Sequence, residues 1–136
     1  MFTLIYLVLQ IRQNTRSIRS QSRFYVLEAL NSDTRSLTEN DRWELSTRVA
    51  IGEANSADLA QWGYVYASWL SHLEMLYFEL LENNLPKDFE HTPRYRLHSL
   101  FKVPNGEENW KTHKGLCTKK FQSYVENLQN DEAQGP

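Results

Sequence analysis

The side chain with the strongest potential for chemistry is Glu74, which interrupts an apolar helical pattern. On a helical wheel its neighbours are Ala67, Leu70, Phe78 and Leu81. A carboxylate buried among such side chains is costly unless it is paired or protonated. We interpret Glu74 as a buried polar residue that meets an arginine or a tyrosine of another helix. The alternatives are an acid in a pocket and a helix rotated enough to expose Glu74. The candidate arginine partners are Arg23, Arg48, Arg94 and Arg96.

Histidine and cysteine side chains offer no recognisable site. No HxxxH or HExxH pair occurs, and His72 and Glu74, two residues apart, point to different sides of a helix. We expect His72 to be solvated. Cys117 precedes an expected helix start, where a thiolate is favoured, but we favour a small, half-buried residue. Nucleophile-elbow, phosphate-loop and dinucleotide motifs are absent from the sequence, which therefore predicts no catalytic residue, metal site or cofactor.

Four arginines follow the apolar opening segment MFTLIYLVLQI. Arg12, Arg16, Arg19 and Arg23 are spaced by four, three and four residues, which places them on one stripe of a helix. The first 27 residues contain no acid, although the whole chain has a net charge of −2. The remainder is therefore mildly acidic, and we expect no binding to nucleic acid.

This opening segment has three possible roles. At ~1.5 Å per residue it covers roughly half of a ~30 Å hydrocarbon core, so it could be part of a membrane span. It could be an interfacial anchor with its arginines at the headgroups, or a soluble helix that packs on the core. A signal peptide does not fit, because the positive charge follows the apolar run. The residues expected to contact a membrane are Phe2, Leu4, Ile5, Leu7, Val8, Arg12, Arg16, Arg19 and Arg23.

Three segments carry a resemblance to a known family. LIYLVLQIRQNTRSIRSQS resembles the opening of a family of short, uncharacterised bacterial proteins that begin with an IYLAIQIRQNT-type segment. WLSHLEMLYFELLENNLP is similar to the core helix of that family, with Glu74 at its acidic position, and PNGEENWKTHKGLCTKKFQSYVENL to its C-terminal pattern. Asn109 and Trp110 stand where two adjacent aromatics are expected. The resemblance implies a membrane-anchored, all-helical architecture and no particular activity.

The longest helical pattern, residues 57–83, organises the expected fold. Glycines and prolines number only 5 and 4, and no segment alternates apolar and polar residues, so we expect no strands. The helical period places one broad apolar face inward. The inward residues are Trp62, Trp69, Leu70, Leu73, Tyr77 and Leu81. The outward residues are Gln61, Ser68, His72 and Glu79.

The remaining elements divide the chain into three parts. Residues 1–30 form the N-terminal helix, which Asn31, Ser32 and Asp33 should end. Residues 31–128 form the bundle, and residues 129–136 a disordered tail. A short helix over residues 41–51 should bury Trp43 and some of Leu45, Val49 and Ala50. The expected caps of later helices are Ser56, Thr92 and Thr118.

These patterns predict an all-α fold, with a long N-terminal helix leading into a bundle of about five or six helices. We predict a non-enzymatic, membrane-associated protein that mediates protein interaction at the cytoplasmic face of a bacterial inner membrane, with a partial or complete span. The alternatives are a ligand binder or enzyme with a pocket around Glu74, and a soluble cytoplasmic interaction module. The sequence does not distinguish a protein partner from self-association.

Overall fold

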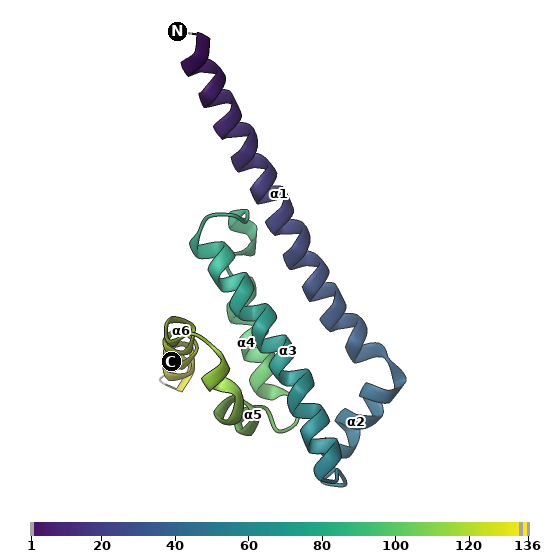
Figure 1. Cartoon of the computed structure of the whole chain (residues 1–136). Helices are drawn as coiled ribbons and strands as arrows, with labels where there is room; N and C mark the ends of the chain where they lie inside the picture. The colour runs from purple at the N-terminus through teal and green to yellow at the C-terminus, as the bar shows by residue number, and fades with distance from the viewer. Residues whose placement is uncertain (1, 134, 136) are drawn as a thin grey trace.

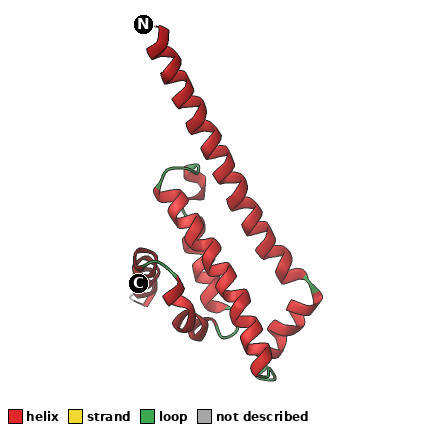
Figure 2. Cartoon of the chain, in the orientation of Figure 1, coloured by secondary structure: helices red, strands yellow, loops and turns green. Residues whose placement is uncertain are grey.

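The computed structural model describes residues 2–133 and 135, and these residues form only helices and connections (Figure 2). The predicted all-α fold is confirmed, with six α-helices and no strand in the described chain. The α-helices are α1 (Phe2–Thr38), α2 (Asn40–Ala50), α3 (Ser56–Leu81), α4 (Thr92–Lys102), α5 (Gly106–His113) and α6 (Lys119–Ala133). Two short 3-10 helices are η1 (Lys87–Phe89) and η2 (Lys114–Leu116).

Helix α3 is the centre of the bundle. It contacts α1, α2, α4 and α5, and Figure 1 shows α1 running beside it and continuing well past its C-terminal end. Helix α6 joins through aromatic stacking, since the rings of Tyr77 and Tyr124 lie 4.4 Å apart between centroids. Each neighbouring helix therefore covers part of the apolar face of α3.

The predicted core face of α3 is largely confirmed. Trp62, Trp69, Leu70 and Leu73 are buried, and the rings of Trp62 and Trp69 meet edge to face at 5.5 Å. Tyr77 is half-buried. Leu81 was expected inside but is 47% exposed. It occupies the last turn of α3 and lines an open hollow, so fewer side chains surround it.

Two local predictions are wrong. Helix α1 does not end near Asn31 but continues to Thr38, because the carboxylate of Asp33 pairs with His72 of α3 instead of capping the helix. Trp43 was expected to be buried but is 67% exposed, whereas Leu45 of α2 is buried as expected. Trp43 and Leu45 are two residues apart and therefore lie on different sides of the helix, so that burial of Leu45 leaves Trp43 facing outward.

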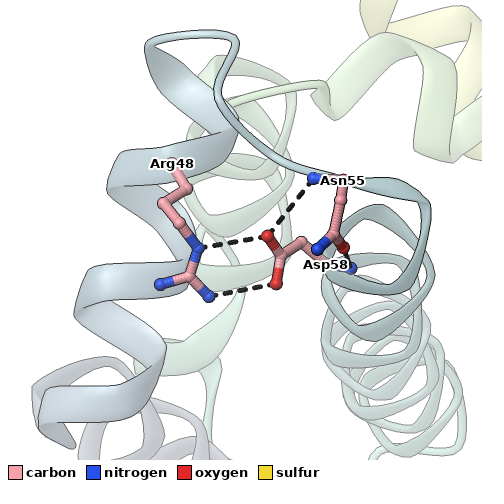
Figure 3. A network of polar contacts seen from close by, with 3 residues as sticks. All are labelled: Arg48, Asn55 and Asp58. Atoms are coloured by element: carbon pink, nitrogen blue, oxygen red, sulfur yellow. Dashed lines mark hydrogen bonds and ion pairs between the residues drawn. The ribbon is translucent and has the colours of Figure 1, made fainter.

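A capping box and an ion pair that share Asp58 stabilise the start of α3 (Figure 3). Asn55 Oδ1 accepts from the Asp58 N–H at 2.8 Å, and Asp58 Oδ2 accepts from the Asn55 N–H at 3.3 Å. The guanidinium of Arg48, on α2, donates to both Asp58 oxygens at 3.1 and 3.0 Å. The N-cap is therefore Asn55 and not the predicted Ser56, and the same carboxylate joins α2 to α3.

The C-terminal helix is longer than expected. The prediction of a disordered tail from residue 129 does not agree with α6, which is helical through Ala133. Gln134 and Pro136 lie outside the described residues. Phe121 and Val125 of α6 are fully buried, so this helix is a packed part of the bundle.

Candidate functional site

The N-terminal part of α1 is an apolar helix without a protein surface to cover it. Every residue from 2 to 21 is exposed, and Phe2 is 91% exposed. Burial on α1 begins with Ser22 and Val26, where the helix reaches α3. A contiguous exposed apolar surface of this kind marks a binding site for a partner or a membrane.

The apolar side chains of residues 2–11 cover most of the circumference of the helix. Successive residues are turned by about 100°, so Tyr6 and Val8 lie on nearly opposite sides, and both are exposed. A helix that packs on one protein surface needs only an apolar stripe, whereas this segment is apolar around most of its circumference, with Thr3 and Gln10 together on the one polar sector. The exposed apolar residues here are Phe2, Leu4, Ile5, Tyr6, Leu7, Val8, Leu9 and Ile11.

The predicted arginine stripe is exposed and has no counter-charge in the described chain. None of Arg12, Arg16, Arg19 and Arg23 forms an ion pair with a described residue. Arg19 and Arg23 line a shallow hollow with residues 83–86, at the end of the bundle. Arg12 and Arg16 lie nearer the apolar segment, beyond this hollow. The structure therefore places all nine predicted membrane-contacting residues on one exposed helical segment.

Glu74 is half-buried, but its partner is not an arginine. Glu74 Oε2 accepts from the backbone N–H of Thr118 at 2.8 Å and from the Thr118 hydroxyl at 3.0 Å. Thr118 precedes α6, and its Oγ1 accepts from the Phe121 N–H at 3.3 Å. The first N–H groups of a helix have no partner inside the helix and attract negative charge. Glu74 thus helps to cap α6, and the predicted arginine partner is wrong.

Cys117 lies beside this cap and is poorly suited to act as a nucleophile. Its side chain is half-buried, and burial raises the pKa of the thiol to about 11, with the charge of Glu74 adding to the effect. A thiol with this pKa carries little thiolate near neutral pH. The expectation of a small, buried or half-buried residue is confirmed, and the raised pKa argues against the alternative of a favoured thiolate.

Two buried polar groups without a hydrogen-bond partner, one on α3 and one on α5, were not predicted. Tyr66 and Asn109 are buried, and neither the Tyr66 hydroxyl nor the Asn109 amide nitrogen has a hydrogen-bond partner in the described chain. Burial is also the main reason that the pKa of Tyr66 is raised. The two helices approach each other closely here, since a Cβ added to Gly63 would lie only 3.0 Å from His113 Nε2. Periodicity alone places Tyr66 in the core but says nothing about its hydroxyl.

The polar contact between α1 and α3 also departs from expectation. His72 Nδ1 lies 2.8 and 2.9 Å from the two carboxylate oxygens of Asp33, and both side chains are partly buried. Burial raises the pKa of Asp33, and the hydrogen bond and charge of His72 act against this rise. His72 was expected to be solvated, but it anchors the C-terminal half of α1 to the bundle.

A small cleft lies between α1, α3 and α4. Its volume is about 110 Å³, which is smaller than the ~150 Å³ cavity known to hold a benzene molecule. Asp33, Arg96 and Ser99 are its polar residues, and its walls are otherwise apolar. Among the described residues, no three histidine, cysteine, aspartate or glutamate side chains are grouped closely enough to hold a metal ion.

None of the helices in the described part of the chain is both long and apolar enough to cross a membrane by itself. No family model, curated protein or solved structure matches this chain. The functional interpretation therefore depends on the geometry of the sites described above, of which the N-terminal part of α1 presents the largest exposed apolar surface.

Proposed function

We propose that this protein is a non-enzymatic, membrane-associated helical protein, attached to a lipid bilayer by the N-terminal part of α1. The observation that carries this proposal is a helical segment, residues 2–11, in which eight of the ten residues are apolar and every residue is exposed, beyond the folded bundle. Apolar side chains around most of the circumference of a helix favour apolar surroundings on more than one side, and a bilayer provides them. A soluble module that docks through one face of α1 accounts for fewer of these side chains.

The test is flotation of the full chain with vesicles of phosphatidylcholine, which carry no net charge. We expect the wild-type chain to float with the vesicles. Leu7→Asp places a carboxylate in the apolar segment and should weaken binding on the order of a hundredfold, as expected for an acid in a bilayer. Leu116→Asp makes the same change at an exposed residue of the bundle and should leave binding unchanged. Failure of the wild-type chain to float, or equal behaviour of the two variants, would refute membrane attachment.

The orientation that we propose places the bundle on the cytoplasmic side. The arginines at residues 12–23 lie between the apolar segment and the bundle, and basic residues next to a membrane segment are enriched on the cytoplasmic side. A reporter that is active only outside the cytoplasm, fused to the C-terminus, should therefore remain inactive. Activity of that reporter would contradict this orientation.

The bundle is the part that we propose for protein interaction. Trp43 of α2, Tyr64 of α3 and Tyr95 of α4 are all exposed, and aromatic side chains are enriched in protein interfaces. Analytical ultracentrifugation measures the oligomeric state of the wild-type chain and of Trp43→Ser. A dimer that the substitution dissociates would indicate contact with a second copy, and a wild-type monomer would leave contact with a different protein. The alternative function, a ligand pocket around Glu74, has less support because that carboxylate is engaged in capping α6.

A further inference from the structure

The position of each arginine along α1 can be compared with the depth of a lipid headgroup layer. At a rise of about 1.5 Å per residue, Arg16 lies roughly 6 Å beyond Arg12 along the helix, Arg19 roughly 10 Å and Arg23 roughly 16 Å. The headgroup region on each side of a bilayer is roughly 5–7 Å thick. A helix that stands upright can therefore place only the first two arginines within this layer.

An upright helix is the orientation that the apolar segment favours. If α1 lay flat on the surface with its polar residues Thr3 and Gln10 toward water, the exposed side chains of Tyr6 and Leu7, which flank them on the helix, would face water as well. Standing upright immerses Tyr6 and Val8 together, even though they lie on opposite sides of the helix. This orientation also keeps the bundle, which begins beside Arg19 and residues 83–86, at the outer edge of the headgroups.

Arg12 and Arg16 are available to bind phosphate. Both are exposed and form no ion pair with any described residue, and no acid precedes residue 28. Helical side chains lean toward the N-terminus of their helix, which in this orientation is toward the bilayer. The planar guanidinium donates two parallel hydrogen bonds to phosphate oxygens, and the positive charge favours an anionic surface.

We infer that Arg12 and Arg16 bind the phosphate groups of an anionic phospholipid surface while α1 stands upright in the bilayer. This inference rests on the proposed membrane attachment and names its lipid partner. Arg19 and Arg23, on the same stripe but beside the bundle, contribute much less to the contact.

The experiment compares two double variants that remove the same charge from the same helix. Arg12→Gln/Arg16→Gln and Arg19→Gln/Arg23→Gln are measured on vesicles of phosphatidylcholine alone and on vesicles that also contain phosphatidylglycerol. We expect the wild-type chain to prefer the anionic vesicles, and this preference to weaken at high salt. The first pair should lose affinity for anionic vesicles on the order of thirtyfold, as expected for two basic residues at the surface, and the second pair less than about threefold.

A second measurement tests the orientation directly. In a Cys117→Ser background, Tyr6→Cys and Val8→Cys each carry an environment-sensitive dye at an exposed residue. An upright helix should transfer both dyes into the apolar phase, with equal blue shifts and equal quenching by brominated lipids. A blue shift at only one of the two positions would show a helix that lies flat, and would overturn the inference.

Other outcomes overturn the inference in distinguishable ways. Equal losses from both arginine pairs would mean that the stripe acts as a whole, and absence of a preference for anionic vesicles would exclude phosphate binding. Arginine-dependent binding to duplex DNA or RNA, without binding to anionic vesicles, would assign the stripe to nucleic acid. If membrane attachment itself is wrong, the wild-type chain binds neither kind of vesicle. If only the arginine assignment or the phosphate binding is wrong, the chain still binds phosphatidylcholine vesicles, and that binding still depends on Leu7.

Discussion

Glu74 and Thr118, 44 residues apart, form the polar connection between the central helix α3 and the start of α6, through contacts of 2.8 and 3.0 Å. One carboxylate oxygen accepts from both the backbone N–H and the hydroxyl of Thr118. The first turn of α6 therefore gains both an acceptor for an otherwise unpaired N–H and a negative charge at the positive end of the helix. Docking of α6 on the bundle and capping of α6 depend on the same side chain.

Removal of this contact should destabilise the fold moderately. Glu74→Ala leaves the Thr118 N–H without its acceptor, and we expect the free energy of unfolding to fall by about 1–2 kcal/mol. Glu74→Gln retains a carbonyl oxygen and should cost less than Glu74→Ala. Urea denaturation measures both variants, and Glu126→Ala, which removes an exposed ion pair of α6, should change stability by less than ~0.5 kcal/mol. A loss from Glu74→Gln as large as that from Glu74→Ala would argue against the capping role.

The apolar face of α3 can be tested with two leucines of the same helix. Leu73 is 4% exposed and Leu81 is 47% exposed. Leu73→Ala should lower the free energy of unfolding by ~2–5 kcal/mol, because it removes buried methyl groups and leaves a cavity, and Leu81→Ala should cost clearly less. Equal effects in urea denaturation would mean that the burial pattern is wrong.

The unpartnered hydroxyl of Tyr66 predicts an unusual response to substitution. Replacing a buried, hydrogen-bonded tyrosine by phenylalanine normally lowers the free energy of unfolding by about 1 kcal/mol. Because the Tyr66 hydroxyl has no partner in the described chain, Tyr66→Phe removes a desolvated polar group and should leave stability unchanged or raise it. The comparison is Trp62→Phe, which removes a hydrogen bond of 2.7 Å to the Pro104 carbonyl and should destabilise. A clear loss of melting temperature in Tyr66→Phe would contradict the prediction.

The two aspartates Asp58 and Asp33 should affect acid stability in opposite directions. The hydrogen bond from Arg48 lowers the pKa of Asp58, so the unfolded chain binds this proton more readily, and the contribution of Asp58 to stability is lost as pH falls below about 4. Burial raises the pKa of Asp33, so the folded chain binds this proton more readily, and its contribution is lost as pH rises above about 4.

Substitution to asparagine tests these signs with one matched change. Asp58→Asn should flatten the decline of melting temperature between about pH 6 and pH 3, whereas Asp33→Asn should make that decline steeper. The relevant comparison is the slope of each curve, because either variant can also shift stability at all pH values. Slopes that change in the same direction would show that one of the two pKa directions is wrong.

The thiol of Cys117 should react slowly. With a pKa of about 11 instead of the ordinary ~8.5, its thiolate fraction near pH 8 is on the order of a hundredfold lower than that of a free cysteine. Iodoacetamide should therefore alkylate the folded chain much more slowly than the urea-unfolded chain. Glu74→Gln removes a nearby negative charge and should speed the reaction, while Glu126→Gln serves as the control. Rapid labelling of the folded wild type would refute the buried environment of this thiol.

Local patterns in the sequence were sufficient to predict the helical class, most of the inward face of α3 and the cap at Thr118. These features depend on residues three or four positions apart, whose relation is determined by the helical repeat itself. The same reasoning failed in part at α2, where both Trp43 and Leu45 were expected inside but only Leu45 is buried. A short helix has few turns with which to define its inward side.

The tertiary structure alone decided the partners of the polar side chains. Glu74 meets Thr118 and His72 meets Asp33, at sequence separations of 44 and 39 residues, and neither pair leaves a local pattern. The pairing with His72 also explains why α1 continues through a run of cap-forming residues, since Asp33 is engaged by another helix. Helical periodicity states which side of a helix a residue occupies, but the packing of one helix on another determines which side chain it meets there.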